Sequence, residues 1–277
     1  MTPHELFFKS VNPTASRTLL LLHGAVSSHH EWDNVAHHLS SYHLLIPDLP
    51  SHGQHSSSPI PLTLENTASL LKDLIANHAH DGKADLVGMS LGGYTAIYLA
   101  QKHPELIGDL FISGVGQSWP KPGTWTSSAN ASVMFLSSSG LTSLPKGVFD
   151  WISTKAGLSV HEGLYADMKA RASYQLTLAV LSMLGEDGDE NWNYRFERVG
   201  KRSVVVAGVL DDGEEACRER GKQLRVGNEQ SMAFKVEGMR HAWDLQDPDL
   251  FAEGIKAWME EESMPERFVL VDSSRCG

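Results

Sequence analysis

Six short runs of apolar residues, each closely followed by glycine or proline, constrain the fold of this chain more than any other feature. The runs are Thr18–Leu22, His43–Ile46, Asp85–Val87, Leu110–Ser113, Ser203–Ala207 and Met232–Val236. Runs of this length that lack a polar side are typical of strands buried on both faces, as in a parallel sheet. The chain is therefore expected to fold around a central, largely parallel sheet.

Helical patterns lie between these runs. Leu64, Ala68, Leu71 and Ile75 recur at intervals of four, three and four residues, which places them on one helix face. Similar stripes occur within residues 32–39, 91–100 and 249–259. Strands that alternate with helices predict a doubly wound α/β sheet with right-handed crossovers.

Residues 117–200 interrupt this alternation, because they contain no convincing buried strand. Helical patterns occur instead around residues 148–152, 161–172 and 174–184. We therefore expect one α/β core, made by residues 1–116 and 201–277, with a mostly helical cap of residues 117–200 inserted into it. The apolar run Phe268–Val271 is expected to add an edge strand, to pack on the core or to serve a partner.

Composition and charge exclude several classes of protein. The 277 residues carry a formal net charge of −11, which opposes binding to nucleic acid or to anionic membrane. Two cysteines cannot form a disulfide framework, residues 1–11 lack the apolar core expected of a signal peptide, and no run of about 20 apolar residues occurs. We expect a cytoplasmic protein that acts on a small molecule without a cofactor; the oligomeric state is left open.

The segment Gly88-Met89-Ser90-Leu91-Gly92 is a G-x-S-x-G motif. It follows the apolar run Asp85–Val87 and precedes a long apolar helical stretch, the context in which such a serine is displayed on a sharp strand-to-helix turn. The small residues on either side allow the strand and the helix to approach closely, and the helix N-terminus favours a developing negative charge. Ser90 is the predicted nucleophile.

An oxyanion hole is expected near the same serine. His23-Gly24 ends the run Thr18–Leu22, so the N–H of Ala25 can point toward a substrate oxygen. The N–H of Leu91, directly after the serine, is the expected second donor.

A serine hydroxyl needs a general base, and imidazole suits neutral pH. Among fourteen histidines, only His241 combines a loop after a predicted strand with a position late in the chain. Asp211 and Asp212 follow the run Ser203–Ala207, and a carboxylate there can accept a hydrogen bond from the base and fix its tautomer. Adjacent side chains point in different directions, so one of the two is expected to be solvated.

These segments together resemble the α/β-hydrolase fold family over residues 1–262. The order Ser90, Asp211, His241 is the family's order of nucleophile, acid and base, and the family position favours Asp211 over Asp212. The segment Asp48–Gly53 resembles the family's loop after its fourth strand, with Ser51 where many relatives have glycine.

The resemblance implies a serine hydrolase, of the carboxylic ester or thioester type, that forms an acyl-enzyme. Esters, thioesters, lactones and the C–C bonds of diketones in small to medium apolar substrates fit this chemistry. A serine nucleophile argues against the dehalogenase and epoxide hydrolase branches, which use aspartate. The alternatives are a lyase or cyclase that uses the triad as acid and base, and a ligand-binding receptor on the same scaffold.

The cap is expected to choose the substrate. Its candidate pocket residues are Trp119, Trp125, Met134, Phe135 and Trp151, with Tyr165, Met168 and Tyr174 as further members.

No metal site is expected. The adjacent histidines His29-His30 and His37-His38 should point to different helix faces, and no H-E-x-x-H motif occurs.

Overall fold

The computed structural model describes residues 5–55, 59–116, 123, 125–185 and 195–271. Its centre is an eight-stranded sheet with the strand order β1-β3-β2-β4-β5-β6-β7-β8. The strands are β1 (Phe8–Val11), β2 (Thr18–Leu22), β3 (His43–Pro47), β4 (Ala84–Met89), β5 (Ile107–Ser113), β6 (Ser203–Gly208), β7 (Met232–Val236) and β8 (Phe268–Leu270). The six inner strands run parallel, and the edge strands β1 and β8 pair antiparallel with β3 and β7.

All six predicted strands are present, and the predicted α/β fold class is confirmed. The C-terminal run forms an edge strand, because Phe268 and Leu270 pair with Val236 and Phe234. Strand β1 was not predicted. Its four residues, Phe-Lys-Ser-Val, are too few to show a regular alternation of apolar and polar side chains, and its two middle residues are exposed.

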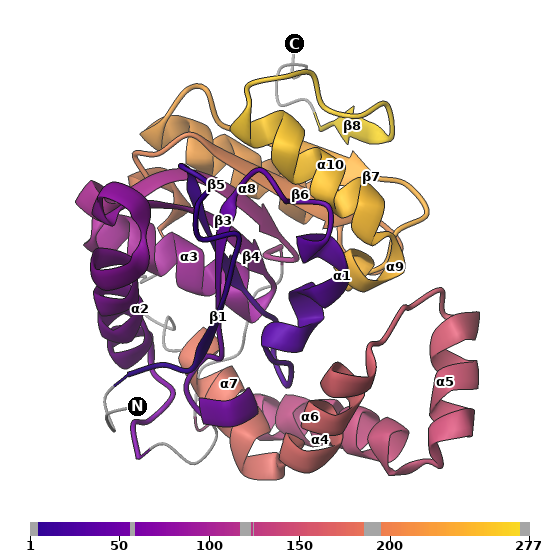
Figure 1. Ribbon diagram of the computed structural model, residues 1–277. Coiled ribbons are helices and arrows are strands. Elements are labelled where there is room, and N and C mark those ends of the chain that lie inside the picture. The colour runs from indigo at the N-terminus through magenta and orange to yellow at the C-terminus, as the bar shows by residue number, and fades with distance from the viewer. Residues whose placement is uncertain (1–4, 56–58, 117–122, 124, 186–194, 272–277) are drawn as a thin grey trace.

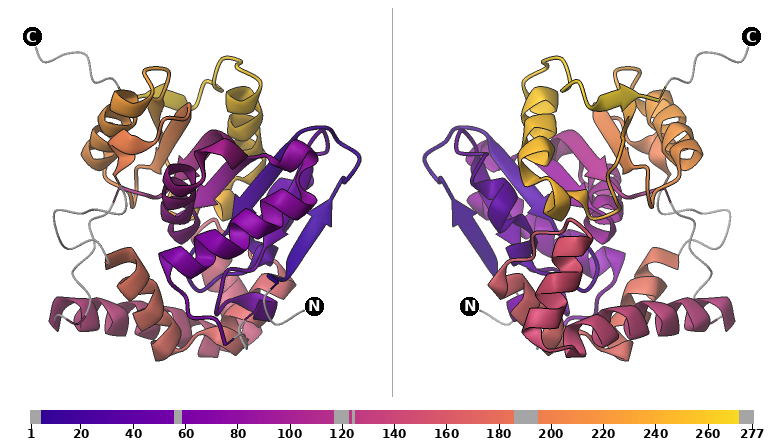
Figure 2. Two further views of the ribbon diagram at one scale, coloured as in Figure 1. Left: turned by 90° about the vertical axis from the view of Figure 1, so that its left-hand side faces the viewer. Right: turned by 90° about the vertical axis from the view of Figure 1, so that its right-hand side faces the viewer.

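Helices cover both faces of the sheet, so the core has three layers (Figure 2). Leu20 and Leu22 belong to the apolar layer that also includes residues of α2 (Leu64–His78), α3 (Leu91–Lys102) and α8 (Glu214–Gly227). Leu19 and Leu21 of the same strand face α1 (Asp33–Ala36) and α10 (Pro248–Met259) on the other side. This division explains why β2 is apolar from Leu19 to Leu22: both of its faces are buried.

Between β5 and β6 the described residues form helices and no strand. The helices are α4 (Trp125–Ser143), α5 (Lys146–Lys155), α6 (Glu162–Arg171) and α7 (Tyr174–Gly185), which lie together at the bottom of Figure 1. We call residues 125–185 the helical insertion. Three of its helices were predicted; α4 was not, because its seven serines leave no clear apolar stripe.

The predicted boundaries of the cap, at residues 116/117 and 200/201, stay a prediction, since residues 117–122, 124 and 186–194 lie outside the described part. None of the helices in the described ranges combines the length and the apolar character that crossing a membrane requires.

Candidate active site

Ser90 occupies the turn between β4 and α3 in a backbone conformation that non-glycine residues rarely adopt. Its φ and ψ angles are 51° and −112°. Strain of this kind persists only where the surroundings hold it in place. Here the Ser90 N–H donates a hydrogen bond of 2.8 Å to the carbonyl of Ser113, at the end of the neighbouring strand β5.

The two glycines of the motif are required by close approach of the backbone. A Cβ atom on Gly88 would lie 2.6 Å from the carbonyl oxygen of Gly92, and one on Gly92 would lie 2.0 Å from the carbonyl oxygen of Leu22. Both distances are far inside van der Waals contact. Helix α3 can therefore begin directly above β2 and β4 only because neither position carries a side chain.

His241 receives its carboxylate partner from Asp212, and the prediction of Asp211 is corrected. His241 Nδ1 lies 2.7 Å from Asp212 Oδ1. The Asp211 carboxylate instead accepts a hydrogen bond of 3.1 Å from the His241 backbone N–H and pairs with Arg240 at 3.2 Å.

The tight turn after β6 explains this choice. The N–H groups of Asp211 and Asp212 both donate to the Gly208 carbonyl, at 3.2 and 2.9 Å, so the two side chains leave the turn in different directions. The Asp212 side chain is 4% exposed, whereas that of Asp211 is 39% exposed. Sequence position alone does not show which of two adjacent aspartates in a turn is the partner of His241, whereas their difference in burial does.

The Asp212 carboxylate sets both the tautomer and the basicity of His241. A carboxylate only accepts, so Nδ1 carries the proton and Nε2 presents its lone pair. Burial favours the neutral imidazole, but the hydrogen bond and charge of Asp212 outweigh it and raise the pKa of His241. The charged imidazolium is thus stabilised where a general base would form it.

Ser113, at the end of strand β5, connects the Ser90 turn with the segment that carries His241. Besides accepting from Ser90, Ser113 accepts a hydrogen bond of 2.8 Å from the indole N–H of Trp243, two residues after His241. Its hydroxyl in turn donates to the Val206 carbonyl at 2.9 Å. The next residue, Gly114, has a φ of +71°, and a Cβ atom there would lie 2.6 Å from the His241 ring. This role of Ser113 was not predicted from the sequence.

The loop after β2 is held so that one amide remains available. The Gly24 N–H donates to both oxygens of Glu31 at 3.1 Å, and the Val26 N–H donates to His52 Nε2 at 3.2 Å. Within the described residues, no acceptor takes the Ala25 N–H between them, nor that of Leu91 in the first turn of α3. The arrangement is that expected of the predicted donors Ala25 and Leu91.

Two buried histidines support this loop in their neutral form. His23 Nδ1 lies 2.7 Å from the Gly24 carbonyl, and its Nε2 accepts from the Leu49 N–H at 3.0 Å. His52 makes hydrogen bonds of the same kind: its Nδ1 donates to the Pro50 carbonyl, and its Nε2 accepts from the Val26 N–H. Burial lowers the pKa of His52 to about 3.

Glu31 and Asp244 form a buried pair of acidic residues beside the site. Glu31 is 5% exposed and Asp244 is 1% exposed. Burial raises the pKa of both carboxyl groups, and the charge of Glu31 raises that of Asp244 further, well above its usual range. Two carboxylates this close resist ionising together. We therefore assign the negative charge to Glu31, which accepts from Gly24, and a neutral acid to Asp244.

A cavity of about 420 Å³ connects these groups with the helical insertion. Ser90, His241, Ala25 and Glu31 line its core side. The remaining lining is mostly apolar and comes largely from the insertion: Met134, Leu141, Phe149, Leu158, Val160, Leu164, Met168 and Leu184. The site is thus a polar floor under an apolar chamber.

The predicted pocket aromatics are mostly wrong. Of the four principal candidates within the described residues, only Met134 lines the cavity. Trp125 and Trp151 are 82% and 62% exposed, and the Phe135 ring packs on Tyr174. Trp119 lies outside the described residues. Met168 does line the cavity. Most of the other lining side chains of the insertion are leucine and valine, which no sequence pattern singled out.

One expectation about the histidines is also wrong. The rings of His29 and His30 do not diverge: their centroids lie 4.1 Å apart with an interplanar angle of 35°. Both belong to the short 3-10 helix η1 (His29–Trp32), which follows the Ala25 loop.

Comparisons with known proteins identify the family of this chain and its fold. The alpha/beta hydrolase family matches residues 19–254. A Gibberella zeae protein named AB hydrolase superfamily protein is 31% identical over 281 residues, which cover 98% of this chain and 89% of that protein. Lipase LipV of Mycobacterium tuberculosis is 32% identical over 108 residues, 39% of this chain and 41% of its own length. A thermophilic esterase from Thermogutta terrifontis has the same fold, with a TM-score of 0.68 at 18% identity over 92% of this chain and 93% of that one.

The close approach at Gly92 predicts a large loss of stability in Gly92→Ala. Its methyl group has no room beside the Leu22 carbonyl, so the free energy of unfolding should fall by about 3 kcal/mol or more. Gly140→Ala in α4 is the matched control, since nothing lies within 4 Å of its Cβ position. It should stabilise by about 0.5–1 kcal/mol. Urea unfolding followed by circular dichroism measures both; equal shifts would contradict the close approach.

The neutral state of His52 predicts a specific dependence of stability on pH. As pH falls through 6.5, the unfolded chain binds a proton at His52, whereas the folded chain does so only near pH 3. Stability is therefore lost on acidification, by about 2 kcal/mol from this group between pH 7 and pH 5. Urea unfolding at pH 7 and pH 5 measures the decrease in the free energy of unfolding. In His52→Gln this decrease should be smaller than in the wild type by about 2 kcal/mol. The same decrease in both proteins would show that His52 is not held neutral.

Proposed function

This chain belongs to the alpha/beta hydrolase family, and we propose that it is a serine esterase that cleaves small to medium-sized apolar esters through Ser90, His241 and Asp212. The observation that carries the proposal is the hydrogen bond of 2.7 Å between His241 and Asp212, beside a serine in a strained turn at the floor of an apolar cavity. The acid of the triad is Asp212 in place of the expected Asp211.

The first half of the reaction acylates Ser90. His241 Nε2 takes the hydroxyl proton while Ser90 Oγ attacks the ester carbonyl, and Asp212 stabilises the imidazolium. The oxygen of the tetrahedral intermediate accepts hydrogen bonds from the N–H groups of Ala25 and Leu91. His241 then gives the proton to the leaving alcohol, and the acyl group remains on Ser90.

The second half returns the enzyme to its starting state. Water enters the position that the alcohol has left, and His241 removes its proton as it attacks the acyl carbonyl. The same two N–H groups hold the second oxyanion. Collapse of this intermediate releases the carboxylic acid and restores the Ser90 hydroxyl. No cofactor is needed for any of these steps.

The cavity and the relatives together support an apolar ester as substrate. The chamber is lined by aliphatic and methionine side chains, which favour hydrocarbon over charged groups. Glu31 at its floor and the net charge of −11 both disfavour an anionic substrate. Two relatives are named lipase and esterase, and both names denote cleavage of an ester bond. Thioesters and lactones share this chemistry and are the next candidates.

The adjacent aspartates provide a matched pair of variants. Asp212→Asn should leave His241 in the wrong tautomer and lower kcat for a p-nitrophenyl ester by about 10³–10⁴-fold. Asp211→Asn, which removes only a half-exposed carboxylate, should change kcat by less than about tenfold. Initial rates at 400 nm measure both, with Ser90→Ala as the background.

Two results would contradict the proposal. If Ser90→Ala hydrolyses the ester at the wild-type rate, Ser90 is not the nucleophile. If Asp211→Asn is as damaging as Asp212→Asn, or more so, the assignment of the triad acid fails. Circular dichroism of each variant establishes that it is folded before its rate is compared.

A further inference from the structure

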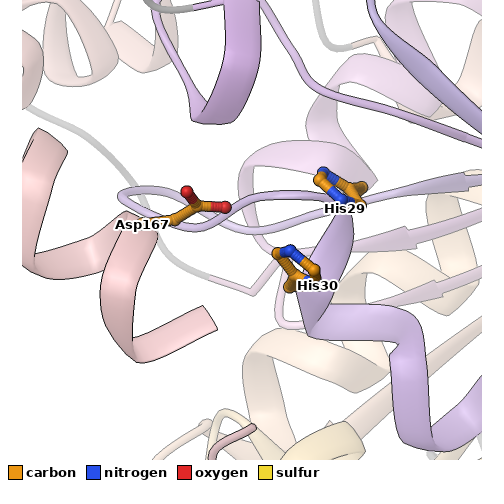
Figure 3. Close-up of side chains that lie close together, drawn as sticks. All are labelled: His29, His30 and Asp167. Atoms are coloured by element: carbon orange, nitrogen blue, oxygen red, sulfur yellow. The ribbon is translucent and has the colours of Figure 1, made fainter. Parts of the chain in front are cut away.

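A cluster of side chains outside the cavity lies where the helical insertion meets the core. His29 and His30 belong to η1, and Asp167 reaches toward both imidazoles from α6 (Figure 3). One potential ligand atom from each residue lies within 4.8 Å of the other two. The cluster shares no residue with the proposed catalytic machinery.

Each imidazole is oriented by a carboxylate on its far side. His29 Nδ1 lies 3.0 and 3.1 Å from the two oxygens of Asp48, and His30 Nδ1 lies 2.6 Å from Asp33. Carboxylates only accept hydrogen bonds, so both Nδ1 atoms carry the proton and both Nε2 atoms present a lone pair. Carboxylate–imidazole pairs of this kind commonly support metal-binding histidines.

The free edge of His30 points at α6. A Cβ atom built on Gly163 would lie 2.6 Å from His30 Nε2, so this nitrogen faces the first turn of that helix. Asp167 follows Gly163 by four residues and therefore lies on the same helix face. One of its carboxylate oxygens is buried and has no hydrogen-bond partner in the described part of the chain.

One nitrogen of each imidazole and the Asp167 carboxylate thus converge, and in the described part of the chain no donor satisfies the buried Asp167 oxygen. A buried carboxylate oxygen without a partner is costly, and two imidazole lone pairs cannot satisfy it. A cation can satisfy all three groups at once. We propose that His29, His30 and Asp167 bind a divalent transition-metal ion, with Zn²⁺ as the preferred ion.

The donor set favours zinc among divalent ions. Two imidazole nitrogens and one carboxylate oxygen suit Zn²⁺ well, whereas Mg²⁺ and Ca²⁺ prefer oxygen ligands alone. Zinc bonds of about 2.0–2.2 Å place neighbouring ligand atoms about 3.4 Å apart. A pair of ligand atoms at the 4.8 Å limit must therefore close by about 1.4 Å, through rotation of the three side chains, and water completes the coordination.

A neighbouring group of His30, Asp33 and His161 is a weaker candidate. His161 Nδ1 already accepts a hydrogen bond of 3.1 Å from the Gly163 N–H, where it caps α6. Asp33 is held by Lys9 at 2.8 Å and by His30. Both would have to give up existing partners to bind a metal, whereas Asp167 has none to lose at its buried oxygen.

An ion at this position would join the two parts that enclose the cavity. Helix α6 contributes Leu164 and Met168 to the cavity wall. On the other side, η1 continues into Glu31, whose carboxylate holds Gly24 beside the Ala25 amide. Zinc would thus fasten the helical insertion to the segment that positions the oxyanion loop.

Titration of the full-length, EDTA-treated protein with ZnCl₂ tests this proposal, with isothermal calorimetry and thermal unfolding as readouts. The wild type should bind one equivalent tightly and gain Tm. Asp167→Asn keeps the shape of the side chain and should weaken binding at least tenfold and abolish the Tm gain; His30→Gln should do the same. Both readouts are independent of ester hydrolysis.

Two control variants separate this site from other histidines. His161→Asn retains a residue that can cap α6, and His38→Asn removes an imidazole that pairs with Asp249 at the surface. Both should bind zinc like the wild type. The proposal is overturned if zinc binds Asp167→Asn as tightly as the wild type, or if His161→Asn or His38→Asn loses the binding. Circular dichroism without metal verifies that each variant is folded.

Discussion

The hydrogen bonds of Ser113 are the interaction on which the rest of the site depends. Its carbonyl holds the strained Ser90 turn at 2.8 Å, and its hydroxyl holds Trp243, just after His241, at the same distance. Nucleophile and base come from segments about 150 residues apart, yet both are fixed against the end of one buried strand. Gly114 beside it leaves room for the His241 ring, so this strand end sets the relation of the two groups.

The floor of the site is a polar network inside an apolar core. Polar groups are tolerated there because most of them have partners of matching type. His23 and His52 each donate through one nitrogen and accept through the other, which fixes both as neutral. Glu31 brings a negative charge close to His241, and that charge also raises the pKa of the imidazole. The oxyanion loop is thus shaped by buried side chains that do not themselves contact a substrate carbonyl.

The sequence predicts the parts of this protein that depend on local pattern. Strands buried on both faces leave continuous apolar runs, and the Ser90 turn leaves two glycines, so the sheet and the nucleophile could be read directly. Asp212 could not be separated from Asp211, because the choice depends on which side of a tight turn is buried. The cavity lining was missed for a similar reason: large aromatic side chains such as Trp125 are conspicuous in a sequence, but the packing of α4–α7 decides which faces turn inward.

Covalent trapping tests most directly the claim that this turn presents an activated nucleophile. The wild-type protein is incubated with a fluorophosphonate, and the intact mass and the proteolytic peptides are measured. We predict one adduct, on Ser90, and much slower labelling in Asp212→Asn, because the base is then held in the wrong tautomer. No adduct, or an adduct on a different residue, would show that Ser90 is not the activated nucleophile.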